Sequence, residues 1–343
     1  MLRDNGLLLI PEWLDEIKNT NIIDDSNIGK FESMLSDYVG VKYCVATCNG
    51  TTAILMSLMA MGLTEGDEII IPSYSYPSVK VCCQQLKLNI KYCDININTL
   101  CMDTNKLEGL ITSNTKAVAF IDHLGYIGND LFKVREICDR YNLLLLEDSA
   151  QGLSQIYNNK MAGTIGNIGI YSFSGAKLLR SGEGGCLVTN SRYYYDKIKS
   201  YINMGIGNYV LSPLSATLLS LQLRDINIIL ENRNRIQQLY RNNLNIVYHE
   251  NNNDSVHAVA YITDKADLIY NTFKLKNIET RYKMYPSQNN MSNSDYIFER
   301  YIELPQSYDL TKEDIDNICS DIIKLESKKS TDKLSSLMSR FNK

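Results

Sequence analysis

One lysine lies where an apolar segment meets a glycine-rich turn. Lys177 follows the apolar run Ile168 to Phe173 and precedes Gly182-Glu-Gly-Gly185. A lysine at the end of a buried strand loses part of its hydration, which lowers its pKa and makes the amine a nucleophile. The small residues around it let a bulky group approach the backbone. The alternative is a solvated lysine in a surface turn, and Lys177 alone does not decide between the two.

A carboxylate ends another predicted strand. Asp148 follows the apolar run Leu143 to Leu146, within Glu147-Asp-Ser-Ala-Gln151. The carboxyl end of a buried strand faces the crevice in which α/β proteins bind ligands. There, Asp148 could pair with a cationic nitrogen of a cofactor. The alternative is that Asp148 caps the following helix.

Phosphate-binding and aromatic side chains follow two further predicted strands. Asn49-Gly-Thr-Thr52 precedes an apolar helix, and backbone N–H groups at a helix start, with a glycine for close approach, form a phosphate cradle. Ser172 could add a hydroxyl group. Tyr74 and Tyr76 come after the predicted strand 68–72, where one ring could stack on a planar ligand or simply pack.

Lysine, carboxylate, aromatic ring and phosphate cradle together match what pyridoxal phosphate requires. Their order resembles the aspartate-aminotransferase fold (fold type I) and, more narrowly, the DegT/DnrJ/EryC1/StrS family of nucleotide-sugar aminotransferases. The resemblance extends from about Gly29 to Ile322. The matching stretches are Cys48–Ala53, Glu65–Tyr76, Glu147–Gln151, Gly166–Phe173, Lys177 with Gly182–Gly185, Gly207–Ala216, and Leu304–Pro305 with Leu310–Asp314.

The resemblance implies roles around the cofactor ring. Lys177 would bind pyridoxal 5'-phosphate covalently and then move a proton between cofactor and substrate carbons, with the pyridoxamine form arising during turnover. Asp148 would pair with the pyridinium nitrogen. Gln151 would lie near the phenolic oxygen, and Tyr76 would stack on the ring.

The resemblance also implies how the phosphate is held and how the chain assembles. Gly50, Thr51 and Ser172 would bind the phosphate from one subunit, and Asn208 would reach it from the other. We therefore expect a homodimer with shared active sites.

The stretch around Lys177 bears on the substrate. The family transfers an amino group from L-glutamate to a nucleotide-linked keto sugar. Ser172-Phe-Ser-Gly-Ala-Lys177 and Gly182-Glu-Gly-Gly185 resemble members that act on carbon 4. We therefore expect a 4-keto-6-deoxyhexose acceptor and a 4-amino-4,6-dideoxy product of the viosamine or perosamine type. Tyr282 and Lys283 are candidate substrate contacts.

Three alternatives belong to the same fold. One is a 3-aminotransferase. A sugar 3-dehydratase, in which histidine replaces the lysine, is disfavoured because Lys177 is present. A non-catalytic regulatory relative is disfavoured because Lys177, Asp148 and Asn208 are intact.

A few positions depart from the family pattern. Val210 stands where the family usually has arginine, and Cys48 replaces a small residue. We assign His123 no role, because the glycine that follows it lies one position earlier than in the family pattern. His249 and His257 lack metal-ligand spacing and are interpreted as surface or packing residues.

The composition excludes several classes of partner. Among 343 residues the formal net charge is -4, so we expect neither nucleic-acid binding nor a polybasic membrane patch. The cysteines number nine, without metal-site spacing, which favours free thiols in the cytoplasm and no metal.

The elements that must position these residues alternate between strand and helix. Apolar runs predict strands at 43–47, 68–72, 90–94, 116–121, 143–147, 168–173 and 185–189. This alternation predicts a three-layer α/β domain with a parallel sheet. We assign residues 1–240 to an N-terminal helical arm and this large domain, with one long helix over 214–240. Residues 241–343 are assigned to a small α+β domain.

Overall fold

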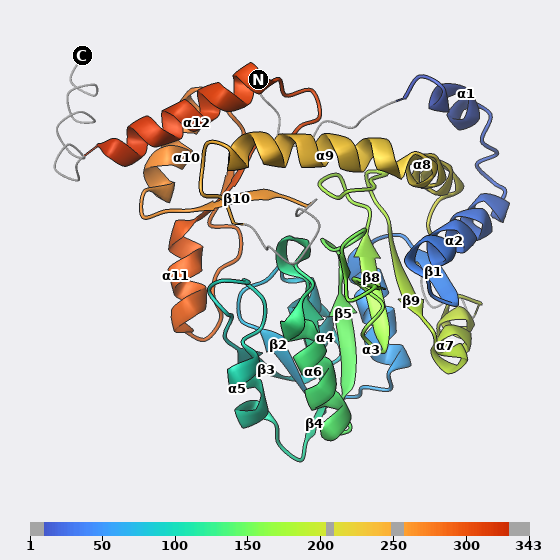
Figure 1. The fold of residues 1–343 in the computed structure, drawn as a ribbon. Coiled ribbons are helices and arrows are strands. Elements are labelled where there is room, and N and C mark those ends of the chain that lie inside the picture. Colours follow the sequence, from blue (N-terminus) through green and yellow to red (C-terminus); the bar gives the residue numbers. More distant parts are fainter. Residues whose placement is uncertain (1–9, 204–208, 248–256, 329–343) are drawn as a thin grey trace.

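A mixed seven-stranded sheet forms the centre of the large domain (Figure 1). The computed structural model describes residues 10–203, 209–247 and 257–328. The strand order is β1-β9-β8-β5-β4-β2-β3. Its strands are β1 (Tyr43–Thr47), β2 (Glu68–Pro72), β3 (Asn89–Cys93), β4 (Thr115–Ile121), β5 (Leu144–Asp148), β8 (Ile168–Ser172) and β9 (Gly185–Thr189).

One strand of this sheet departs from the parallel arrangement that the sequence predicts. β9 pairs antiparallel with both β1 and β8, whereas β5 is parallel to β4 and β8. The chain returns from β8 to β9 through residues 173–184 without a crossover helix, and a direct return places consecutive strands antiparallel. The carboxyl ends of β1 and β8 therefore meet the beginning of β9 at one edge.

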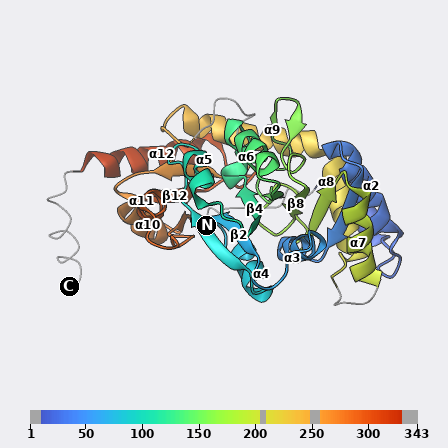
Figure 2. The same cartoon turned by 90° about the horizontal axis from the view of Figure 1, so that it is seen from below.

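Helices cover both faces of the sheet. Successive side chains of a strand point to opposite faces, so Ala117, Ala119 and Ile121 of β4 join one core while Val118 and Phe120 join another. Figure 2 shows α3 and α4 on one side of the sheet and α6 on the other. The covering helices are α3 (Gly50–Ala60), α4 (Ser78–Gln85) and α7 (Arg192–Asn203) on the first face, and α2 (Ser26–Val39), α5 (Thr104–Leu107), α6 (Asn129–Arg140) and α8 (Pro213–Arg224) on the second.

The N-terminal arm packs on α8. Trp13 of α1 (Trp13–Lys18) is fully buried, and its indole N–H donates to the Asp225 carboxylate at 2.7 Å. Phe31 and Leu35 of α2 are also buried. The single helix predicted over 214–240 is wrong. Asp225 separates α8 from α9 (Ile226–Arg241), and its carboxylate accepts the Trp13 bond at this break.

The small domain is built on a three-stranded antiparallel sheet of order β10-β12-β11. Its helices pack on one face of the sheet and bury Phe273, Ile302 and Ile318. α9 belongs to both cores, because Ile226 packs in the large domain and Tyr240 in the small one. The elements are β10 (Val259–Ile262), α10 (Ala266–Leu275), β11 (Arg281–Tyr282), α11 (Ser292–Arg300), β12 (Tyr301–Leu304) and α12 (Lys312–Ser327), of which α11 and β12 were not predicted.

An aromatic cluster joins the two domains. The second face of the small sheet contributes Tyr301 and Ala260, which pack with Tyr74 and Leu124 of the large domain. The Tyr74 and Tyr301 ring centroids are 6.3 Å apart, at an interplanar angle of 69°. This contact holds β11 near the carboxyl edge of the large sheet.

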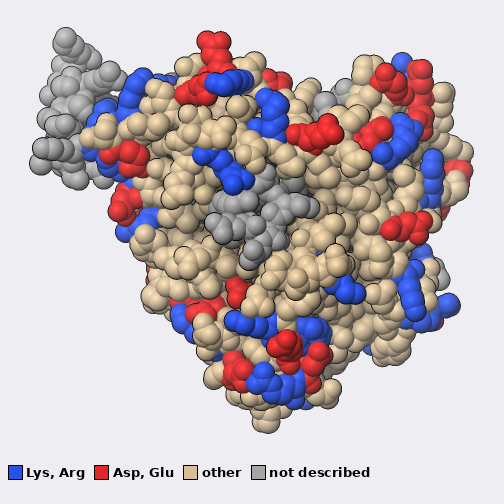
Figure 3. Space-filling view, viewed as in Figure 1, with Lys and Arg blue, Asp and Glu red and all other residues tan. Residues whose placement is uncertain are grey.

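Short elements complete the described chain. They are the hairpin β6 (Ile156–Tyr157) and β7 (Lys160–Met161), and the 3₁₀ turns Glu108–Leu110 and His123–Gly125. In the described part of the chain, no helix has both the length and the apolar character needed to cross a bilayer. Figure 3 shows charges of both signs interspersed over one face of the molecule.

Glu147 fixes the loop between β5 and β8. Its buried carboxylate accepts backbone N–H bonds from Gly163 at 2.5 Å, Ile165 at 2.8 Å and Gly166 at 2.7 Å. Burial raises the pKa of Glu147, and these three bonds oppose the shift. The Glu147 carboxylate therefore supplies the hydrogen-bond acceptors that a neighbouring strand would otherwise offer to these loop N–H groups.

Glu147→Gln should lower the free energy of unfolding by about 3 kcal/mol, because an amide N–H₂ would face buried backbone donors. The midpoint of urea unfolding measures this loss. Glu108→Gln is the control, since Glu108 forms an ion pair with Arg140 at the surface. Such a pair contributes about 0–1 kcal/mol to the free energy of unfolding. Equal midpoints for the two variants would contradict the role of Glu147.

Candidate active site

A cavity of about 550 Å³ lies at the carboxyl edge of the large sheet. The first turn of α3, the ends of β5 and β8, and the turn after β8 form its large-domain wall. The small domain adds His257, Arg281, Met284 and Tyr285. The cavity thus brings together side chains that are far apart in the sequence.

Lys177 lines this cavity from the turn after β8. Its side chain is half-buried, and its backbone N–H donates to the Ser174 carbonyl at 3.0 Å. Burial lowers the pKa of Lys177 to about 8, while attraction to Asp148 and Glu303 opposes the shift. The amine is therefore neutral at lower pH than an ordinary lysine, which favours its use as a nucleophile.

Asp148 lies at the last position of β5 and is 6% exposed. One carboxylate oxygen accepts the Ala150 N–H at 3.1 Å, and a turn follows rather than a helix. Burial raises the pKa of Asp148, whereas the Ala150 N–H and the Lys177 charge lower it. Asp148 is therefore a buried carboxylate on the cavity wall, available to a cationic partner.

Gln151 supports the same wall. Its Oε1 accepts the Leu124 N–H at 2.6 Å, and its side chain also hydrogen-bonds Tyr285. These two contacts hold the amide at the junction between the large domain and the small one.

The start of α3 forms an anion-binding surface. Asn49 caps the helix, since its side-chain oxygen accepts the Thr52 N–H at 2.8 Å. The N–H groups of Gly50 and Thr51 have no partner within the helix because they belong to its first turn. Thr51 Oγ1 also lies 2.9 Å from the hydroxyl of Ser78, a cavity residue that sequence reasoning missed.

Two glycines make this surface possible. Thr47, Gly185 and Ser172 lie side by side at the ends of β1, β9 and β8. A Cβ on Gly185 would overlap the backbone nitrogen of Gly50, and a Cβ on Gly50 would come within 3.1 Å of the Ser172 Cβ. The close approach of α3 to the sheet therefore depends on both glycines, and it brings Ser172 beside the helix start.

The two candidate tyrosines lie in different surroundings. Tyr76 lines the cavity, is 59% exposed, and meets Tyr285 edge-on with centroids 6.1 Å apart. Tyr74 is buried and packs against His123 with centroids 5.5 Å apart. Of the two rings, only that of Tyr76 faces the cavity, and His123 packs in the aromatic cluster.

The candidate substrate contacts of the small domain lie outside the cavity. Tyr282 packs against the small-domain core, and Lys283 pairs with Glu299 at 2.7 Å. The structure brings Arg281 and Tyr285 to the cavity instead. Strand alternation separates Arg281 from Tyr282, and the left-handed backbone at Lys283 (φ 54°) ends β11 and redirects the chain.

His257 belongs to the cavity wall, although the sequence suggested surface or packing. It is 5% exposed, and burial together with the charges of Lys177 and Arg233 lowers its pKa well below the ordinary range. Its ring is therefore neutral at physiological pH. Asn208 and His249 lie outside the described residues.

Val210 serves packing. Val210 is half-buried against the core formed by α2 and α8, and the Tyr209 carbonyl accepts the Cys48 N–H at 2.8 Å. The nine cysteines are free, and among the described residues no group of histidine, cysteine or acidic side chains could hold a metal ion.

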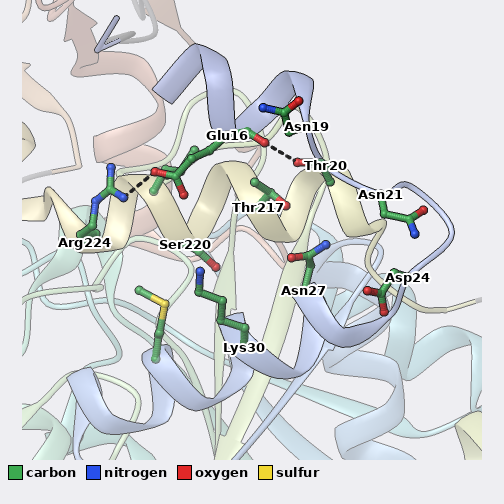
Figure 4. A pocket seen from close by; sticks show the side chains of 12 residues that line it. Glu16, Asn19, Thr20, Asn21, Asp24, Asn27, Lys30, Thr217, Ser220 and Arg224 are labelled. Carbon is green, nitrogen blue, oxygen red and sulfur yellow. Dashed lines mark hydrogen bonds and ion pairs between the residues drawn. The ribbon is translucent and has the colours of Figure 1, made fainter. Parts of the chain in front are cut away.

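A second cavity, of about 450 Å³, lies between α1, α2 and α8 (Figure 4). Arg224 pairs with Glu16 at 2.7 Å, and the Thr20 hydroxyl donates to the Glu16 carbonyl at 3.0 Å. Lys30 and Asp24 also line it, but no strand end contributes a side chain. Its polar groups therefore do not reproduce the lysine and carboxylate of the first cavity.

Comparison with known proteins agrees with this geometry. The model of the DegT/DnrJ/EryC1/StrS aminotransferase family matches residues 10–323. The GDP-perosamine synthase of Vibrio cholerae is 30% identical over 284 residues, which cover 76% of this chain and 77% of that protein. The GDP-perosamine synthase of Escherichia coli O157:H7 is 27% identical over 342 residues, covering 91% and 94%.

A solved structure supports the fold. The GDP-4-keto-6-deoxy-D-mannose-3-dehydratase of E. coli, with bound hydrated PLP, superimposes with a TM-score of 0.83. It is 21% identical, and the match covers 93% of this chain and 98% of that one. The fold is therefore that of fold-type-I enzymes, as the sequence predicts.

The reactivity of Lys177 should follow its lowered pKa. In cofactor-free protein, the rate at which an uncharged amine-reactive reagent modifies Lys177 should rise with pH and reach half of its maximum at about pH 8. Ordinary lysines reach half of the maximum near pH 10.4. Asp148→Asn removes the charge that favours the ammonium, so the midpoint should move to still lower pH. Peptide mass spectrometry follows each lysine separately, and a midpoint near pH 10 for Lys177 would contradict the assignment.

Proposed function

Because the chain belongs to the DegT/DnrJ/EryC1/StrS aminotransferase family, we propose that it is a pyridoxal-phosphate-dependent aminotransferase acting on a nucleotide sugar. The amino group moves from L-glutamate to carbon 4 of a nucleoside-diphosphate 4-keto-6-deoxyhexose. The observation that carries this proposal is the convergence of Lys177, Asp148 and the start of α3 on one cavity.

The cavity fits the cofactor. Gly50, Thr51 and Ser172 offer N–H and hydroxyl donors to a phosphate, and any side chain on Gly50 would narrow that space. Asp148 offers a buried carboxylate to a pyridinium nitrogen. Tyr76 supplies a ring at the cavity wall, and Gln151 adds an amide to the same wall.

The chain's own residues handle attachment and proton transfer. When bound, the cofactor supplies an electron sink for the carbon that carries the amine. Lys177 Nζ would hold the cofactor and would then carry a proton between the cofactor and substrate carbons, a task that suits a pKa of about 8. The Asp148 carboxylate, held by the Ala150 N–H, would keep a proton on the cofactor's pyridine nitrogen.

The position of amination rests on two supports. Ser172–Lys177 and Gly182–Gly185 resemble carbon-4 enzymes, and the two curated relatives described above are GDP-perosamine synthases. The nucleotide is left open among dTDP, UDP and GDP.

Assembly and location complete the proposal. The cavity mouth, with Tyr76 59% exposed, suits a homodimer in which Asn208 of the partner subunit reaches the phosphate. The free cysteines suit the reducing cytoplasm.

Cofactor binding gives the first test. Wild-type protein mixed with pyridoxal phosphate should absorb at roughly 390–420 nm, as expected for a lysine-bound cofactor. Lys177→Ala should lose both the borohydride-fixed adduct and turnover, because the attachment point is gone. Lys312→Ala, at the surface of α12, should keep both. Wild-type protein that stays colourless after pyridoxal phosphate is added would contradict the proposed aminotransferase activity. Colour without turnover would instead favour a non-catalytic regulatory relative.

Product structure gives the second test. Incubation with L-glutamate and GDP-, dTDP- or UDP-linked 4-keto-6-deoxyhexose should give a product whose amine lies on carbon 4, assigned by NMR. The 3-keto sugar should not be aminated. An amine on carbon 3, or a 3-deoxy product, would instead show a 3-aminotransferase or a dehydratase.

A further inference from the structure

We propose that Asp122 is a neutral carboxylic acid that positions Asp148, so that Asp148 remains the anion facing the cofactor's pyridine nitrogen. Asp122 directly follows β4 and does not line the cavity, so it acts through its neighbours. The part of the inference that concerns the cofactor rests on the proposed function, whereas the protonation of Asp122 does not.

Asp122 joins the two turns that follow β4 and β5. Its backbone N–H donates to the Asp148 carbonyl at 3.1 Å, and its carboxyl oxygen Oδ2 is hydrogen-bonded with the Ser149 hydroxyl. A Cβ on Gly152 would come within 2.9 Å of the same oxygen, so the turn after β5 packs directly on Asp122. Asp122 therefore holds both the backbone of Asp148 and the residue that follows it.

Two buried carboxyl groups share the hydroxyl of Ser149. Its Oγ is hydrogen-bonded with Asp122 Oδ2 and lies 3.5 Å from Glu147 Oε1, and all three side chains are fully buried. A serine hydroxyl has a single hydrogen, so it can donate to only one of the two carboxyl groups. A proton on Asp122 Oδ2 removes this conflict, because Asp122 then donates to Ser149 and Ser149 donates to Glu147.

The donors around the pair favour a proton on Asp122 over one on Glu147. Glu147 accepts three backbone N–H bonds, which stabilise its ionised form. Asp122 Oδ1 is buried and has no hydrogen-bond partner in the described part of the chain. A buried charge without donors is costly. Burial, together with the charge of Glu147, accordingly raises the pKa of Asp122 well above its ordinary range.

The groups that face Asp122 offer no positive charge to offset a second anion. Those that titrate are all acids, namely Glu147 and Asp148 of β5, Tyr171 of β8 and Cys101. The ring of His123, in the same turn as Asp122, packs against Tyr74 instead. An ionised Asp122 would therefore raise the pKa of Asp148 by repulsion. The neutral acid leaves Asp148 as the charged partner for a cofactor.

Infrared spectroscopy of the full chain tests the protonation directly. A protonated carboxylic acid gives a C=O stretch above the amide and carboxylate bands, so the difference spectrum between wild type and Asp122→Asn should contain one such band. The band should persist at neutral pH, where an ordinary aspartic acid, with a pKa of about 3.9, is ionised. Ser149→Ala should move it to higher wavenumber, because the Asp122 O–H loses its acceptor. Asp139→Asn is the control, since Asp139 pairs with Arg135 at 2.6 Å and should leave the band unchanged.

The bound cofactor tests the positioning role. Asp122→Leu keeps the approximate shape and removes both oxygens, so it should weaken the binding of pyridoxal phosphate by about 10- to 100-fold, as do changes in residues that orient a ligating side chain. It should also move the pH midpoint of the cofactor's visible band, because Asp148 is no longer fixed. Asp122→Asn should restore the wild-type midpoint, because its amide is neutral and can donate to Ser149.

Three results would overturn the inference. The first is an infrared spectrum of Asp122→Asn identical to that of wild type. The second is a midpoint displaced by about one pH unit or more in Asp122→Asn, which would reveal a charge on Asp122. The third is unchanged cofactor binding in Asp122→Leu; if that variant does not fold, Ser149→Ala, which breaks the same contact, takes its place. Wild-type protein that shows the infrared band but stays colourless with pyridoxal phosphate would instead refute the proposed function.

Discussion

The partial burial of Lys177 beside a buried carboxylate is the constraint on which the site depends. Burial lowers the pKa of Lys177, and the nearby charge of Asp148 keeps that shift moderate. Both side chains must lie at the same edge of the sheet for this balance to exist. The order β8-β5 provides it, because the two strands are parallel neighbours and end together. The start of α3, drawn close by Gly50 and Gly185, then completes the wall.

In the small domain, the pairing of β11 with β12 decides which side chains complete the site. Antiparallel pairing places Arg281 opposite Glu303 and Tyr282 opposite Ile302, so neighbouring residues face the cavity and the core. The aromatic cluster around Tyr74 and Tyr301 packs the small sheet against the large domain. One domain therefore supplies the reactive groups, and the other supplies the cation and the neutral His257 that face them.

Much of this arrangement is predictable from local sequence, and the rest depends on tertiary pairing. Apolar runs predict the large-sheet strands closely, and Lys177 and Asp148 stand out because each follows such a run. The antiparallel direction of β9 depends on how its loop returns. Arg281 shows no alternation of polar and apolar residues that would single it out, because β11 has only two residues. Its pairing with β12 decides which side chain enters the cavity. At the interruption between α8 and α9, Asp225 likewise accepts a hydrogen bond from Trp13, far away in the chain.

The attachment point of the cofactor tests the central claim most directly. Protein loaded with pyridoxal phosphate is reduced with borohydride, digested and mapped by mass spectrometry. We predict that one peptide carries the cofactor and that fragmentation places it on Lys177, in the turn between β8 and β9. A cofactor on another lysine, or spread over several surface lysines, would contradict the site described above.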